Sequence, residues 1–289
     1  MPDRILVTTG NGMFGHALIE KLLDRDDIEV RAMVRDRSKF TLTGTNLCVV
    51  EANMDDPASL EPVTRDITHV FVTSPMDEQI TARETAVVDA CKVNGMPHVI
   101  SIYGAVRHDG DHLDALHLAA IEHLKSSGLP WTLVSPNSVM ETSLISSKEE
   151  IAMGQMSGIS GEGRIGMVAL DDVASVMAAV ATSEGHESAN YELTGPAAVT
   201  LGEVAEAFTR VLPHPVNYVD MSEEAFAQML MEYAGFTTAE EVEIQVICHL
   251  RAWKEGRASL VTDTVEQLIG RGPMSVEQWI QKNQAMFVG

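Results

Sequence analysis

The first half of the chain alternates short apolar runs with longer segments whose apolar residues recur at helical spacing. The short runs are apolar at nearly every position, which is typical of parallel strands covered on both faces. We expect strands at Ile5–Thr9, Glu29–Val34, Leu47–Glu51, His69–Thr73, His98–Tyr103 and Trp131–Ser135. We expect helices near Met13–Asp24, Pro57–Arg65, Asp77–Asn94 and Asp114–Ser127. This alternation predicts an α/β fold with a doubly wound parallel-sheet Rossmann domain.

The pattern then changes, because residues 138–166 are rich in Ser, Gly and Met. Such a segment is typical of the departure point of a second lobe. Beyond it we expect a strand at Met167–Ala169, a helix from Asp171, a strand at Tyr191–Leu193 and a helix over Leu201–Leu212, with residues 220–289 mainly helical. We therefore predict a Rossmann domain over residues 1–150 and a smaller, mainly helical substrate lobe over residues 151–289, with parts near 165–195 returning to the Rossmann domain.

Composition excludes two classes of partner. Forty-two acidic residues against twenty basic ones give a net charge of −22, which would repel nucleic-acid phosphates and otherwise favours solubility. No stretch reaches the roughly 18 uncharged apolar residues of a membrane helix, and the N-terminal apolar run is too short for a signal peptide. Three widely spaced cysteines, Cys48, Cys91 and Cys248, indicate free thiols in a reducing compartment, so we expect a cytoplasmic protein.

A glycine-rich motif follows the first predicted strand and opens the first predicted helix. Its residues are Gly10, Asn11, Gly12, Met13, Phe14 and Gly15. In this context the first glycine permits a tight turn, the second lets the backbone approach a pyrophosphate, and the third allows the helix to pack closely on the strand. The helix N-terminus supplies N–H donors and a positive dipole. The motif predicts a dinucleotide site; the alternative is a glycine turn that binds nothing.

The end of the second predicted strand bears on which dinucleotide binds. An NAD-binding Rossmann unit usually has Asp or Glu there to accept hydrogen bonds from the ribose hydroxyls. This chain has Arg35, followed closely by Arg37 and Lys39, and a planar guanidinium suits the oxygens of a 2′-phosphate. We therefore expect NADPH rather than NADH. The alternative is that Arg35 caps the sheet edge or pairs with Asp36.

Further cofactor contacts are expected from loops at the carboxyl ends of the other strands, where open sheets bind ligands. Met54 is a candidate to cover the adenine and Asp55 to accept its amino group, although an acidic turn before a helix explains Asp55 equally well. The loop after the fourth strand adds Thr73, Ser74 and Pro75.

Six segments carry further recognisable motifs: the Gly10–Gly15 loop, Val30–Asp36, Ser127–Thr132, Val134–Asn137, Asp171–Ala174 and Tyr191–Pro196. Together they resemble the NmrA-like family of atypical short-chain dehydrogenases/reductases. The resemblance implies NADP(H) across the sheet edge and a substrate cleft between two lobes, and it places Pro136 and Asn137 beside the nicotinamide. Members of the family reduce quinones, dyes, imines or phenylpropanoid ethers, while others bind the dinucleotide and regulate partner proteins.

The Tyr-x-x-x-Lys pair of ordinary short-chain dehydrogenases is absent. The corresponding positions, counted back from Ser127-Gly128, hold Leu113 and His117, which argues against alcohol dehydrogenation and sugar epimerisation. The resemblance aligns His117 with the lysine of isoflavone-reductase-like relatives, and an imidazole can donate a proton at neutral pH. His117 is therefore the candidate general acid, with Tyr103 and Ser101 as secondary catalytic candidates. The alternative is that His117 only hydrogen-bonds a ribose hydroxyl or a backbone carbonyl.

The loop over residues 108–114 concentrates His and Asp side chains, but its spacing fits no standard zinc pattern, so we expect no metal. The leading hypothesis is an NADPH-dependent reductase that transfers hydride to an unsaturated small-molecule acceptor of the quinone, enone, imine or aromatic ether type. We expect this substrate to be apolar or aromatic. The alternative is a non-catalytic, NADP(H)-responsive regulator that binds a partner protein. The sequence leaves a homodimer open.

Overall fold

The computed structural model describes residues 3–106 and 112–288. The chain divides into two compact units. The first comprises Met1–Tyr103, His112–Ser135 and Val173–Tyr191, and the second comprises Gly104–Asp111, Pro136–Asp172 and Glu192–Gly289. The division into functional domains over residues 1–150 and 151–289 stays a prediction.

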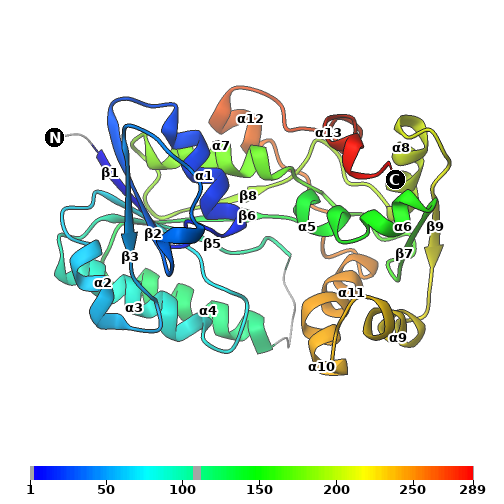
Figure 1. Ribbon diagram of the computed structural model, residues 1–289, viewed down its shortest axis with the longest axis horizontal. Coiled ribbons are helices and arrows are strands. Elements are labelled where there is room, and N and C mark those ends of the chain that lie inside the picture. Colours follow the sequence, from blue (N-terminus) through cyan, green and yellow to red (C-terminus); the bar gives the residue numbers. More distant parts are fainter. Residues whose placement is uncertain (1–2, 107–111, 289) are drawn as a thin grey trace. The chain divides into compact units, whose positions relative to one another are not determined.

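A seven-stranded sheet forms the centre of the first unit (Figure 1). Its strands are β1 (Asp3–Val7), β2 (Ile28–Val34), β3 (Leu47–Glu51), β4 (His69–Val72), β5 (His98–Ile102), β6 (Trp131–Pro136) and β8 (Ala189–Leu193). They are arranged in the order β3-β2-β1-β4-β5-β6-β8, and the pairs from β3 to β6 are parallel. The order reverses at β1, as in a doubly wound sheet. The predicted fold class and all six strands expected before residue 136 are confirmed.

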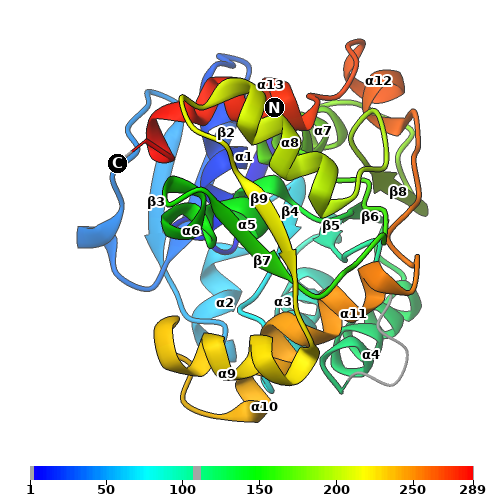
Figure 2. The same ribbon diagram turned by 90° about the vertical axis from the view of Figure 1, so that its right-hand side faces the viewer.

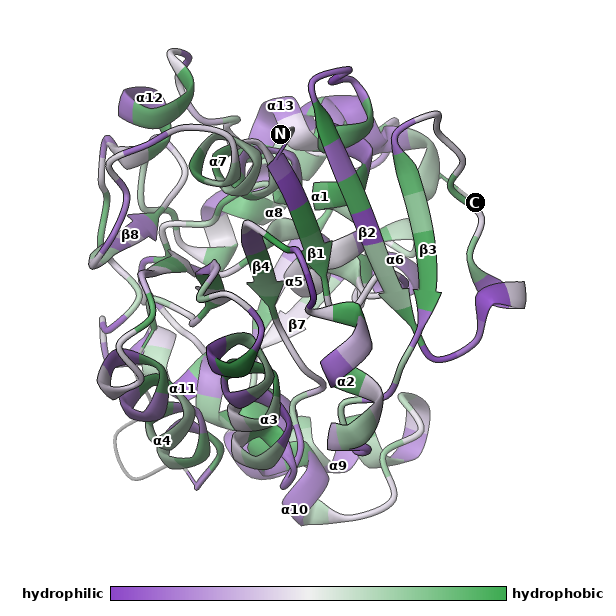
Figure 3. Cartoon of the chain, turned by 90° about the vertical axis from the view of Figure 1, so that its left-hand side faces the viewer, coloured by the Kyte–Doolittle hydropathy of each residue, from purple (hydrophilic) through white to green (hydrophobic). Residues whose placement is uncertain are grey.

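Helices cover both faces of this sheet (Figure 3). One face carries α1 (Met13–Leu23) and α7 (Leu170–Ala181), and the other carries α2 (Pro57–Val63), α3 (Ile80–Val93) and α4 (His112–Ser126). Leu6, Val70, Val99 and Leu133 from the strands share one apolar cluster with buried residues of α2, α3 and α4. The core therefore fixes the helices against the sheet, and the carboxyl ends of its strands carry the predicted cofactor loops. A short 3-10 helix, η1 (Arg37–Lys39), follows β2.

The second unit is mainly helical, and Figure 2 shows a two-stranded parallel sheet within it. Its strands are β7 (Gln155–Gly158) and β9 (Asn217–Asp220). Its helices are α5 (Met140–Ile145), α6 (Lys148–Ala152), α8 (Leu201–Val211), α9 (Glu223–Tyr233), α10 (Ala239–Val242), the π-helix η2 (Glu243–Ile247), α11 (Cys248–Lys254), α12 (Thr264–Ile269), α13 (Val276–Asn283) and the 3-10 helix η3 (Gln284–Met286). The ring of Phe287 packs on those of Phe208 and Trp279, with centroid distances of 4.9 Å to Phe208 and 6.0 Å to Trp279.

The strand expected at Met167–Ala169 was wrong. Only Val168 pairs with another chain segment there, in an isolated bridge to Val139. The neighbouring Gly166 donates its N–H to the Ala258 carbonyl at 2.9 Å instead of to a strand. Three apolar residues in a row cannot by themselves distinguish a ladder from a single bridge, because that depends on a distant partner.

In the described part of the chain, no helix is both long enough and apolar enough to cross a bilayer.

Candidate cofactor and active site

The glycine-rich loop turns sharply between the end of β1 and the start of α1. The Gly10 N–H donates to the Met33 carbonyl oxygen at 2.9 Å, and the Gly12 N–H donates to the Thr9 carbonyl oxygen at 2.8 Å. A Cβ at Gly10 would lie 3.1 Å from Val34 Cγ1 and 3.2 Å from the Met33 carbonyl oxygen. The first glycine therefore lets the loop pass close against β2.

The start of α1 presents backbone donors that have no acceptor among the described residues of the helix. Gly12 is the N-cap residue and makes no side-chain cap, while its carbonyl accepts the His16 N–H at 2.8 Å. The first N–H groups of a helix have no acceptor within that helix, so the amides of Met13, Phe14 and Gly15 are available to an anion. Asn11 is exposed at the tip of the loop.

Two further features of the loop fit a dinucleotide. A Cβ on Gly15 would overlap the carbonyl group of Thr9, so only glycine lets α1 pack this closely against the loop. The Thr9 Oγ1 atom is buried and has no hydrogen-bond partner among the described residues. A buried hydroxyl without a partner is costly, and it lies beside Gly12 and Gly15, where a phosphate oxygen would satisfy it.

Beyond β2, the basic side chains have different surroundings. Arg35 is exposed and forms no ion pair with any residue in the described ranges 3–106 and 112–288. Asp36 instead accepts hydrogen bonds from the Ser38 N–H and hydroxyl at 3.0 and 2.6 Å, and its Oδ2 atom lies 3.6 Å from Lys39 Nζ. These bonds lower the pKa of Asp36. The pairing of Arg35 with Asp36, the alternative to phosphate binding, is therefore not seen, and the Arg37 side chain donates to the Val49 carbonyl of β3.

The loop after β3 places its two candidate residues differently. Met54 is buried in the apolar cluster of the first unit. The Asp55 carboxylate accepts a hydrogen bond from Arg83 Nε at 2.6 Å, while Arg83 Nη1 binds both oxygens of Asp77 at 2.8 Å. The two carboxylates raise the pKa of Arg83, and Arg83 lowers the pKa of Asp77. Both adenine contacts stay predictions, and Arg83 would compete with the adenine for Asp55.

The loop after β4 lies directly beside the end of β1. The Thr73 N–H donates to Thr8 Oγ1 at 3.4 Å, and the Thr8 hydroxyl is 3.3 Å from the Thr73 carbonyl oxygen. Ser74 donates its hydroxyl to Glu84 Oε1 at 2.8 Å, and Pro75 is exposed. This loop is thus held on one side by β1 and on the other by α3.

The three candidate catalytic residues lie at the end of β5 and on α4. The rings of Tyr103 and His117 pack edge to face with centroids 5.7 Å apart. The Tyr103 hydroxyl donates to Asp114 Oδ1 at 2.8 Å, and His117 Nε2 lies 3.8 Å from Glu84 Oε1. Ser101 is buried within β5, between β4 and β6. The structure therefore brings Tyr103 and His117 together, in contact with two carboxylates.

Glu84 is the residue that sequence reasoning missed. Its side chain is 5% exposed, and on α3 it shares the buried face with Ile80, Val87, Val88 and Cys91. A carboxylate in the middle of an apolar helical stripe is costly to bury unless it is paired. That break in the 3.6-residue pattern was the available signal.

Pro136 and Asn137 belong to the second unit. The Pro136 carbonyl accepts the Ala105 N–H at 2.9 Å. Asn137 is buried, and its amide group donates to the Ala258 carbonyl at 3.0 Å while its oxygen accepts the Ser138 N–H at 2.7 Å. The Asn137 side chain thus already has partners in the protein, and contact of these two residues with a nicotinamide stays a prediction.

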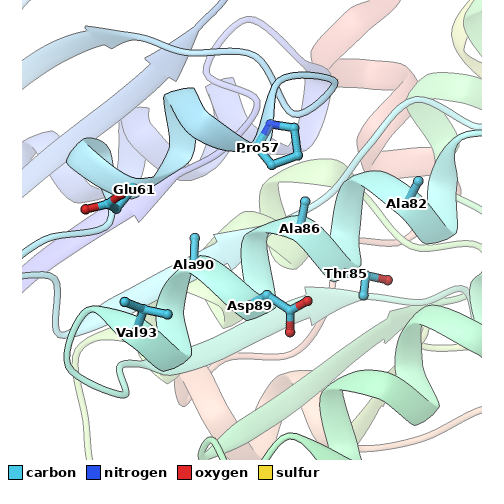
Figure 4. Close-up of a pocket in the computed structure, with 8 residues that line it drawn as sticks. All are labelled: Pro57, Glu61, Ala82, Thr85, Ala86, Asp89, Ala90 and Val93. Atoms are coloured by element: carbon cyan, nitrogen blue, oxygen red, sulfur yellow. The ribbon is translucent and has the colours of Figure 1, made fainter.

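A surface groove and the candidate metal ligands add nothing to the candidate cofactor site. Figure 4 shows a groove lined by α2 and α3 residues, including Ala82, Ala86 and Ala90, and none of its lining residues belongs to the predicted cofactor loops. No group of three or more metal-ligating side chains occurs within the described residues. The histidine- and aspartate-rich loop lies largely outside them, because residues 107–111 are not described.

A family model described as NAD(P)H-binding matches residues 10–184, which is more than half of the chain. The chain belongs to this NAD(P)H-binding family. The matched segment begins at the first glycine of the loop and includes Arg35, Glu84 and His117. The family assignment inferred from the NmrA-like motifs is confirmed.

Named relatives of this NAD(P)H-binding protein align along nearly its whole length. The (4-alkanoyl-5-oxo-2,5-dihydrofuran-3-yl)methyl phosphate reductase of Streptomyces griseus is 27% identical over 98% of this chain and 99% of its own length. The NAD(P)H azoreductase of Xenophilus azovorans is 27% identical over 98% of this chain and 99% of its own. The NADPH-dependent quinone oxidoreductase QOR2 of Escherichia coli, solved with NADPH, superposes with a TM-score of 0.88 at 24% identity, over 97% of this chain and 99% of that one. This last likeness shows the shared fold.

Proposed function

We propose that this protein is an NADPH-dependent reductase that transfers hydride to an unsaturated small-molecule acceptor. The proposal depends on one observation: the glycine loop and the first backbone amides of α1 are combined with an exposed Arg35 at the end of β2. The free amides of the first helical turn suit a pyrophosphate, and an exposed guanidinium without an ion pair in the described chain suits a 2′-phosphate. The relatives named as reductases support the same reaction class.

We assign cofactor binding to one set of residues and proton transfer to another. The chemistry that NADPH would supply is hydride donation from its nicotinamide ring. The amides of Met13, Phe14 and Gly15 would hold the pyrophosphate, and Arg35 would bind the 2′-phosphate. His117 provides the proton that balances hydride addition, since no Tyr-x-x-x-Lys pair is present.

The chemical class of the hydride acceptor can be inferred from these residue roles. A site without the usual tyrosine–lysine pair favours substrates that accept hydride readily, such as quinones, enones, imines or activated aromatic ethers. We propose an apolar or aromatic acceptor. We also propose a cytoplasmic location, supported by three cysteines, which are odd in number and widely spaced along the chain. A homodimer stays a prediction.

An NADPH oxidation screen against quinones, enones and imines tests the proposal. We expect multiple turnovers with at least one class, and a loss of about a hundredfold or more in kcat for His117→Ala, the contribution of a general acid. Leu118→Ala, an exposed change on the same helix, is the matched control and should keep its activity. Tight NADPH binding without turnover of any acceptor would overturn the reductase and favour an NADP(H)-responsive regulator.

A further inference from the structure

Three carboxylate–histidine pairs join α4 to α3 and to the residues just before it. His112 Nε2 lies 2.8 Å from Glu78 Oε2, which precedes α3, and His123 Nε2 lies 2.9 Å from Asp89 Oδ1 near its middle. Between them, His117 Nε2 lies 3.8 Å from Glu84 Oε1. The outer two pairs are exposed to solvent, whereas the side chains of His117 and Glu84 are only 12% and 5% exposed. The central pair is therefore the only one of the three shielded from water.

Glu84 also reaches the cofactor side of the first unit. Its Oε1 atom accepts the Ser74 hydroxyl at 2.8 Å, and Ser74 belongs to the loop after β4 that is predicted to contact the cofactor. One carboxylate oxygen thus faces both that loop and the candidate proton donor. A buried carboxylate interacts strongly with neighbouring donors because little water screens it.

The His117 ring is restricted from a second direction. Tyr103 packs against it at an interplanar angle of 90°, and the Tyr103 hydroxyl is itself held by Asp114. A ring packed edge to face and facing a carboxylate through Nε2 has few other orientations. Nε2 points toward Glu84, so Nδ1 is the nitrogen left for a substrate.

We propose that Glu84 is a positioning residue that acts through His117, keeping a hydrogen on Nε2 so that Nδ1 delivers the proton. This inference rests on the proposed reductase function. In the step, the acceptor gains a hydride from NADPH and a proton from Nδ1; the Nδ1–H bond breaks and NADPH becomes NADP⁺. The neutral imidazole that remains carries its hydrogen on Nε2, facing the carboxylate, and Nδ1 is reprotonated from solvent. A carboxylate that orients a histidine tautomer in this way is a known catalytic device.

Nitrogen NMR of the NADP⁺-bound protein tests the tautomer directly. The ring signals of His117 are identified by their loss in His117→Gln and measured at pH 9. We expect the Nε2–H tautomer to predominate in the wild type, because the Glu84 carboxylate lies 3.8 Å from Nε2 and little water screens its charge. The ratio of Nε2–H to Nδ1–H should fall by roughly tenfold in Glu84→Gln, which removes that charge. Glu84→Asp, which keeps the charge, should restore part of the ratio.

Asp89→Asn is the matched control, since it removes the carboxylate of an exposed pair on the same two helices. It should leave the His117 signals unchanged. An unchanged His117 tautomer ratio in Glu84→Gln overturns the proposal, and so does an equal change in Asp89→Asn.

Kinetics supply the second readout. We expect Glu84→Gln to lower kcat by about tenfold with little change in the KM for NADPH, while Asp89→Asn keeps both. A rise in KM with unchanged kcat would overturn the role in proton delivery. If none of the tested acceptors supports NADPH oxidation by the wild type, the proposed reductase function is wrong. The tautomer ratio still decides whether Glu84 acts on His117.

Discussion

Three basic residues within five positions, Arg35, Arg37 and Lys39, have different surroundings in the structure. Arg37 donates to a β3 carbonyl and Lys39 lies near Asp36, so both have partners in the protein. Arg35 is exposed and has no ion-pair partner in the described chain. Its charge is therefore the one most available to a ligand phosphate.

Arg35→Ala should weaken NADPH binding selectively. The expected rise in Kd is about tenfold to a hundredfold, because a hydrogen bond to a charged group contributes about 1.5–3 kcal/mol. The Kd for NADH should stay within about twofold, since NADH has no 2′-phosphate. Calorimetry with both dinucleotides measures this, with Arg65→Ala, which removes an exposed arginine paired with Glu61, as the control. An equal loss for NADH and NADPH would remove Arg35 from the phosphate site.

Two glycines of the loop should separate folding from binding. A Cβ at Gly15 overlaps the Thr9 carbonyl, so we expect Gly15→Ala to lower the free energy of unfolding by about 1–3 kcal/mol. A Cβ at Gly12 would lie 3.2 Å from the Thr9 carbonyl oxygen, a milder overlap than at Gly15. Gly12→Ala should therefore lower the free energy of unfolding less than Gly15→Ala does, yet bind NADPH poorly. Thermal unfolding and calorimetry of both variants check this contrast, which a similar Tm loss in both would contradict.

At the scale of elements, two neighbouring strands of the large sheet begin with a histidine. His69 is the first residue of β4 and His98 the first residue of β5, at the ends opposite to the predicted cofactor loops. The His69 and His98 rings lie 5.6 Å apart, and His98 Nε2 is 2.8 Å from Thr132 Oγ1. The Thr132 hydroxyl donates to the His186 carbonyl, so the His98 nitrogen is the donor to Thr132. Burial lowers the pKa of both histidines, and His69 lowers that of His98 further.

These lowered pKa values predict an acid-sensitive fold. Both histidines are neutral in the folded state over a range in which the unfolded chain binds protons, so their stabilising contribution is complete above about pH 6.5 and is lost as the pH falls toward the folded-state pKa values. Between pH 7 and 5 we expect the free energy of unfolding to fall more steeply in the wild type than in His98→Gln. Urea unfolding at several pH values measures the difference, and parallel pH curves for the two proteins would argue against it.

At the scale of the whole molecule, contacts between residues far apart in the chain hold the second unit together. Asp172 is fully buried, and its oxygens bind Arg271 Nη1 at 2.5 Å and the Met274 N–H at 2.7 Å. Glu141 likewise accepts from the Leu170 N–H and from Trp279 Nε1, each at 2.8 Å. Two carboxylates therefore fix residues 271–279 to the segment over residues 141–172.

Asp172→Ala should destabilise the protein strongly. It leaves the Met274 N–H without its acceptor and Arg271 without its buried partner, for an expected loss of about 2–3 kcal/mol in the free energy of unfolding. Asp171, whose carboxylate is 32% exposed and 3.1 Å from the same arginine, provides the control, and Asp171→Ala should cost less than about 1 kcal/mol. Urea unfolding compares the two; similar losses would mean that burial of Asp172 does not decide its role.

Local patterns in the sequence were enough for the strands of the large sheet, the glycine loop and the family. Strand and helix periods are short-range, and Gly15 or Arg35 can be interpreted from its neighbours in the chain. The strands β7 and β9 were missed, and the strand at Met167–Ala169 was expected wrongly, because pairing depends on partners such as Val139 that the local pattern does not contain.

The sequence by itself therefore determined the kind of fold and the kind of ligand, since both follow from periodicity and from a motif contiguous in the chain. Only the tertiary structure decided which side chains are available. It assigned the Asn137 amide to the Ala258 carbonyl, 121 residues away, and placed Glu84 against His117 from another helix. Hydrogen bonds and charge pairs act over a few ångströms, so their partners are set by which elements pack together and not by distance along the chain.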